Sequence, residues 1–72
     1  MTDKRLINKI KVFRAMENWT QEELAMRVGV TRKTINTVEN GKFVPSAYLA
    51  LRIAQAFGVP VEDVFQIPND EP

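Results

Sequence analysis

The stretch "GVTRKTINTVENG", residues 29–41, decides how this sequence is interpreted. It has a glycine at each end, and its apolar residues Ile35 and Val38 are spaced to form the buried stripe of a short helix. The outward face of that helix would carry hydrogen-bonding and basic groups and no acid. These residues are Arg32, Lys33, Asn36, Thr37 and Asn40. A surface of this composition favours an anionic partner.

A second helix is predicted immediately before this stretch, over "TQEELAMRV", residues 20–28. Thr20 is a suitable N-cap, and Glu23 stands three residues later, which is the spacing of a capping box. Trp19 precedes the cap, where it can pack against Leu24 as a hydrophobic staple. The helix therefore has a well-marked start.

Only "GVT", residues 29–31, separates the two helices. A short turn that contains glycine, between helices that cross at a large angle, is the helix-turn-helix. Ala25 is small enough for a close crossing, and Gly29 supplies the positive φ that a tight turn needs. Thr31 caps the helix that follows. The pattern predicts a helix-turn-helix motif over residues 21–40.

Three further helices are predicted from apolar spacing, caps and glycines, over residues 9–17, 47–57 and 61–65. Two short apolar pieces, "RLIN" at 5–8 and "FQIP" at 65–68, lie at opposite ends of the chain and are predicted to pair as a small antiparallel ribbon. The alternative is a continuous first helix that begins near Lys4. We expect one domain over residues 6–67 and a flexible tail over 68–72, because the tail is polar and carries prolines.

The charge is unevenly distributed along the 72 residues, although the net charge is only +1. Residues 1–44 carry nine Lys or Arg and five Asp or Glu, a net of +4, whereas residues 45–72 carry one Arg and four acids, a net of −3. This asymmetry indicates a polar molecule whose N-terminal part faces an anion, with nucleic acid as one candidate.

Several functional classes are disfavoured by what the sequence lacks. It contains no cysteine and no histidine, so disulfides and the commonest metal ligands and general bases are excluded. No phosphate-cradling glycine loop or paired carboxylates are evident, so we expect neither an enzyme nor a bound metal, cofactor or small-molecule ligand. Without a membrane-spanning run or a signal-peptide pattern, the expected protein is soluble and cytoplasmic.

The segment "WTQEELAMRVGVTRKTINTVENGKFVPSAYLALRIAQAFGVPVEDVF" resembles the helix-turn-helix proteins of the phage Cro and CI repressor type, the XRE family. The resemblance covers about residues 6–67, and its most specific parts are "TQEELA", "GVTRKTIN", "VENGKFVPS" and "ALRIAQAFGVPVEDVF". It implies an all-α fold of five helices and sequence-specific binding of double-stranded DNA, usually as a two-fold homodimer.

Candidate DNA-contacting residues come from the motif and from this resemblance. In a helix-turn-helix the second helix of the motif lies in the major groove with its first residues at the base edges. Arginine and lysine suit guanine, asparagine suits adenine, and a threonine methyl can touch thymine. The expected base contacts are Arg32, Lys33, Asn36 and Thr37. The resemblance implies phosphate contacts by Gln21, Thr31, Asn40 and Lys42, together with backbone N–H groups of the loop after Asn40.

Two structural expectations accompany the DNA contacts. The resemblance pairs Arg14 of the first helix with Glu39, as an ion pair that would orient the reading helix. An exposed apolar patch would hold two copies together, and its candidates, which alternatively close the monomer's own core, are Leu6, Tyr48, Val61, Phe65 and Ile67.

The expected role is a transcriptional regulator, and a repressor in particular, acting on a palindromic operator. The alternative is the antitoxin of a toxin–antitoxin pair that uses the same DNA-binding domain. The chain also departs from the family: Lys33 stands where glutamine is frequent, so no base preference is carried over at that position.

Overall fold

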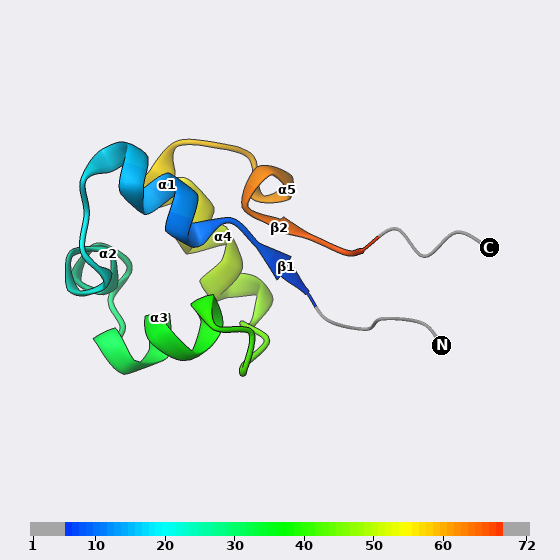
Figure 1. The fold of residues 1–72 in the computed structure, drawn as a ribbon, viewed down its shortest axis with the longest axis horizontal. Coiled ribbons are helices and arrows are strands. Elements are labelled where there is room, and N and C mark those ends of the chain that lie inside the picture. The colour runs from blue at the N-terminus through cyan, green and yellow to red at the C-terminus, as the bar shows by residue number, and fades with distance from the viewer. Residues whose placement is uncertain (1–5, 69–72) are drawn as a thin grey trace.

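The computed structural model describes residues 6–68, and within them it contains five helices and a two-stranded ribbon. In chain order these are β1 (Ile7–Asn8), α1 (Ile10–Glu17), α2 (Gln21–Val28), α3 (Arg32–Glu39), α4 (Ala47–Phe57), α5 (Val61–Val64) and β2 (Phe65–Gln66). Figure 1 shows α2 and α3 on one side of α1 and α4, with α5 and the ribbon on the other side. The predicted five-helix fold is confirmed.

The ribbon joins the two ends of the described chain. β1 and β2 pair antiparallel, with Ile7 opposite Gln66 and Asn8 opposite Phe65. The ribbon prediction is therefore confirmed, and a first helix running through from Lys4 is wrong because residues 7–8 are extended. Most of the expected tail, residues 69–72, lies outside the described residues.

Local caps set most helix boundaries. The hydroxyls of Thr20, Thr31 and Ser46 each accept a hydrogen bond from the backbone N–H three residues later, at 3.0, 3.2 and 3.1 Å. The capping box is only half formed, because the Glu23 carboxylate binds Arg27 Nε at 2.9 Å, one turn further along α2. The last helix ends one residue earlier than predicted, since Phe65 is extended and begins β2.

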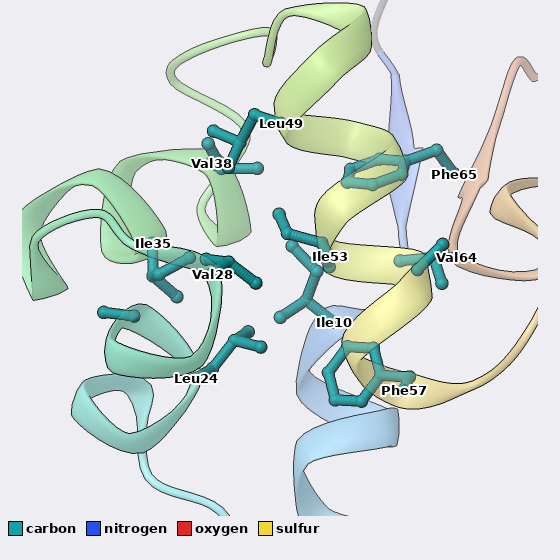
Figure 2. Close-up of a cluster of buried hydrophobic side chains, with 12 residues drawn as sticks. Ile10, Leu24, Val28, Ile35, Val38, Leu49, Ile53, Phe57, Val64 and Phe65 are labelled. Carbon is teal, nitrogen blue, oxygen red and sulfur yellow. The ribbon is translucent and has the colours of Figure 1, made fainter.

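Every helix contributes to one hydrophobic core, which Figure 2 shows in close-up. The fully buried side chains are Ile10 from α1, Leu24 from α2, Ile35 and Val38 from α3, Ile53 from α4 and Val64 from α5. Burying a side chain of this size stabilises the fold by about 1.5–3 kcal/mol. The core therefore fixes the position of α3 from its inner side and leaves its outer side free.

An aromatic cluster extends this core at the junction of α1, α2 and α4. Trp19 stacks on Phe57 with ring centroids 5.5 Å apart, and Phe13 stacks on the same Phe57 at 5.3 Å. The guanidinium carbon of Arg27 lies 4.1 Å from the Trp19 ring centroid, at cation–π distance. The stacking of Trp19 on Phe57 of α4 is a contact between distant segments that local spacing does not reveal.

Candidate nucleic-acid interface

The turn between α2 and α3 is held by backbone bonds and by one glycine. The N–H groups of Gly29 and Val30 both donate to the Ala25 carbonyl, at 2.9 and 3.0 Å. Gly29 has φ +80°, a conformation that side chains rarely adopt. Val30 packs against the core, so the turn is anchored at its middle residue. This geometry gives the helix-turn-helix that the sequence predicts over residues 21–40.

The outer face of α3 carries the residues expected to contact bases. Arg32, Lys33 and Asn36 are exposed, whereas Ile35 and Val38 on the opposite side are buried. Thr37 is half-buried, and its hydroxyl donates to the Thr34 carbonyl at 2.9 Å. The face therefore presents two cations and an amide to solvent, with the half-buried Thr37 beside them.

A polar network links this face to α2. Gln21 Nε2 donates to Glu39 Oε1 at 2.6 Å and to Asn36 Oδ1 at 3.2 Å. Asn36 Oδ1 also accepts from Asn40 Nδ2 at 3.3 Å. Bidentate pairing of Asn36 with adenine uses the same oxygen, so it requires Asn36 to exchange one of these bonds. The Asn36 NH₂ group can donate to an incoming ligand without such an exchange.

Arg14 and Glu39 meet in a two-pronged ion pair between α1 and α3. Arg14 Nε lies 2.8 Å from Glu39 Oε2 and Nη2 lies 3.1 Å from Oε1, with the two side chains 16% and 7% exposed. Arg14 Nη1 also donates to the Trp19 carbonyl at 2.8 Å. The Arg14 guanidinium thus joins α1, the α1–α2 connection and α3, and the pair turns the acid of α3 away from the outer face.

The environment of Glu39 favours its charged form. Burial raises the pKa of Glu39, but hydrogen bonds from Arg14 and Gln21 and the positive charges of Arg14 and Lys11 lower it by more. The net pKa lies below the ordinary value of 4.5. Glu39 is therefore a carboxylate near neutral pH, and the network around α3 remains intact there.

Asn8 is a residue of this site that sequence reasoning missed. Its Nδ2 donates to the carbonyls of Val38 and Glu39, both at 3.2 Å, and its Oδ1 accepts from the Ile10 N–H at 3.1 Å. One side chain thus caps the C-terminal end of α3 and the start of α1. The sequence carries no local signal for the contact with α3, because 30 and 31 residues separate the partners.

The loop after α3 uses three of its backbone N–H groups within the fold. The N–H groups of Asn40, Gly41 and Lys42 donate to the carbonyls of Asn36, Val38 and Thr37, at 3.0, 3.1 and 2.9 Å. These three backbone donors complete the end of α3 and are not directed outward to a phosphate. The exposed Lys42 side chain is the group of this loop that can reach an anion. Thr31 is also exposed, with its hydroxyl engaged as the N-cap.

The five candidate interface residues fall into two groups. Phe65 is buried, and Leu6 and Val61 pack against the core, so these three close the monomer. Tyr48 and Ile67 are 73% and 81% exposed and are the members that face solvent. For Phe65 the structure therefore favours the alternative given above, in which the residue closes the monomer's own core, because its side chain is buried beside that of Val64.

Among residues 6–68, no group of three or more His, Cys, Asp or Glu side chains is arranged to hold a metal ion. None of the helices in that range has the length and apolar character needed to cross a membrane.

Several known proteins similar to this chain are named as helix-turn-helix transcriptional regulators or transcription factors. The chain matches the helix-turn-helix family over residues 10–64. It is 52% identical to an uncharacterized HTH-type transcriptional regulator of Methanocaldococcus jannaschii, over 89% of this chain and 97% of that relative. Among solved structures, the hypothetical transcription factor NHTF from Neisseria is similar with a TM-score of 0.74 and 29% identity, over 82% of this chain and 68% of that one.

A more distant relative is the antitoxin HipB of Escherichia coli, which is 35% identical over 72% of this chain and 55% of its own length. This match favours neither a plain regulator nor an antitoxin.

Proposed function

Because the chain belongs to the helix-turn-helix family of transcriptional regulators, of the XRE or Cro/CI type, we propose that it represses transcription by binding a specific sequence in duplex DNA. The observation that carries the proposal is the exposed, acid-free outer face of α3, which the core and the Arg14–Glu39 pair hold outward. A rigid helix of this kind fits the major groove of B-form DNA. DNA binding, and not catalysis, is the activity of this family.

We assign base contacts and phosphate contacts by the position of each side chain relative to α3. Arg32, Lys33, Asn36 and Thr37 read base edges from the outer face of α3. Phosphate contacts from Gln21, Thr31, Asn40 and Lys42 set the register of that face on the duplex. For Gln21 this requires Nε2 to exchange one of its bonds to Asn36 and Glu39 for the phosphate. Residues 6–67 act as the DNA-binding domain.

We further propose that the protein acts as a homodimer in the cytoplasm. One reading helix contacts only a few base pairs, whereas two helices about 34 Å apart read both halves of a palindrome. The exposed Tyr48 and Ile67 are the remaining candidates for the contact between copies. Occupying a promoter in this way blocks the polymerase from the same DNA.

Selection of bound fragments from random duplex DNA tests this function. The expected result is an enriched palindrome whose half-sites are about one helical turn apart. Sedimentation of the protein with that DNA should give two copies on each duplex. The matched control is the Arg32→Ala, Lys33→Ala double variant, which should not enrich the same palindrome. Failure of the natural protein to enrich any duplex sequence would contradict sequence-specific binding.

A further inference from the structure

A shallow hollow of about 210 Å³ lies at the edge of the outer face of α3. It is lined by Lys33, Thr34 and Thr37 from the helix and by Phe43 from the loop that follows. Phe43 is 51% exposed, which is high for a phenylalanine that helps to line a concave surface. The hollow shares Lys33 and Thr37 with the face proposed to read bases, so a bound duplex would cover both at once.

The groups that line the hollow are mostly apolar, although the helix face around it is polar. The Thr37 hydroxyl is turned back to the Thr34 carbonyl at 2.9 Å, so its methyl is the group left to line the hollow. Lys33 is exposed, and a lysine can line an apolar recess with its methylene stem while its ammonium stays in solvent, available for an anion. Together with Phe43 from the loop, these residues make a small, mostly apolar recess on a basic surface.

The edges of base pairs in the major groove consist of hydrogen-bonding groups and one apolar group, the C5 methyl of thymine. A methyl group is small enough for this recess, and the cation of Lys33 beside it favours a polyanionic partner over an apolar protein surface. We propose that the hollow receives the C5 methyl of a thymine in the operator, and that Phe43 is a specificity-determining residue. This inference rests on the proposed function, because it needs the outer face of α3 to lie in the major groove.

The first arm of the test uses the natural protein and the palindrome obtained by selection. Each thymine of one half-site is replaced in turn by uracil, which removes the methyl and preserves base pairing. At one or more positions the dissociation constant should rise about fourfold, the value expected for exposing one buried methyl-sized group to water. The other positions should change little.

The second arm compares two variants of neighbouring loop residues. Phe43→Ala should weaken binding to the thymine duplex and bring the thymine-to-uracil ratio at the sensitive position close to one. Val44→Ala is the matched control, because Val44 is 68% exposed, lies next to Phe43 and does not line the hollow. It should keep the ratio of the natural protein. Circular dichroism of both variants verifies that the fold is retained.

Two results would overturn the inference. One is an operator in which no thymine is sensitive to uracil, and the other is a Phe43→Ala protein that still distinguishes thymine from uracil as the natural protein does. Either result would leave the proposed function standing, since a specific duplex would still be bound. Absence of binding to any duplex would instead overturn both.

Discussion

The inner and outer sides of α3 differ in burial and in the contacts that their side chains make within the protein. On the inner side Ile35 and Val38 are buried, and Glu39 is fixed by Arg14 and Gln21 within 3.1 Å. On the outer side Arg32 and Lys33 are exposed cations. The inner side gives the helix a defined position, and the outer side, where we propose that DNA binds, can change without loss of that position. Stability and sequence reading should therefore be separable by mutation.

The largest effect is expected on the inner side, from Glu39→Ala. This change leaves the largely buried Arg14 guanidinium without its carboxylate and should lower the free energy of unfolding by about 3 kcal/mol. Urea denaturation measures it. The matched control is Glu23→Ala, which breaks an exposed ion pair with Arg27 and should cost about 0.5 kcal/mol or less. Equal losses in the two variants would contradict the special role of the inner side.

The same pair predicts a pH dependence. Because the pKa of folded Glu39 lies below its ordinary value of 4.5, its contribution to stability is complete above that pH and is lost as pH falls through the folded pKa. The difference in stability between the natural protein and Glu39→Ala should therefore shrink in acid below about pH 4.5. A constant difference down to pH 3 would contradict this assignment.

The next effect is expected on the outer side, from Arg32→Ala. Loss of a base contact should weaken binding by about 2 kcal/mol at one operator position and relax the preference there. The free energy of unfolding should change by less than about 0.5 kcal/mol, because Arg32 is exposed. Binding to a panel of single-base operator variants is the measurement. An equal loss on every sequence would assign Arg32 to phosphate contact instead.

A smaller effect is expected where the ribbon meets the end of α3. Asn8→Ala removes the donor to the Val38 and Glu39 carbonyls and should lower the free energy of unfolding by about 1 kcal/mol. Asn8→Asp separates the two roles of this side chain, since it keeps an acceptor for the Ile10 N–H and loses both donors. If Asn8→Asp is as stable as the natural protein, the bonds to α3 contribute nothing.

The smallest effect is expected from Lys42→Ala on the outer side. Removing one phosphate contact should reduce the slope of log affinity against log salt by about one unit, with the operator preference unchanged. Titrations at several salt concentrations measure this slope. An unchanged slope would remove Lys42 from the set of phosphate contacts.

Local signals in the sequence were sufficient for most of the fold. The caps Thr20, Thr31 and Ser46 act within one helical turn, so residue type and spacing predict where their helices begin. Gly29 and the short turn likewise predict the helix-turn-helix. The outer-face residues of α3 follow directly from helical periodicity, since the inward positions Ile35 and Val38 fix the outward ones.

The contacts that hold the site in place were harder to predict. Asn8 binds carbonyls 30 and 31 residues away, and Arg52 Nη2 donates to the Arg27 carbonyl at 3.3 Å across 25 residues. Such side-chain-to-backbone bonds depend on where the packed helices bring chain segments together, and residue spacing does not encode them. Arg14 and Glu39 are separated by a similar number of residues along the chain, and their pairing was expected only through the family resemblance.

The central claim is that the outer side of α3 is the DNA-binding surface. Its most direct test is a titration of the isotope-labelled protein with the selected duplex, followed by amide and side-chain chemical shifts. The account predicts that the largest changes fall on Gln21, on Thr31 to Asn40 and on Lys42, with small changes in α5 and the ribbon. Changes concentrated on α5 and the ribbon, with α3 unaffected, would contradict it.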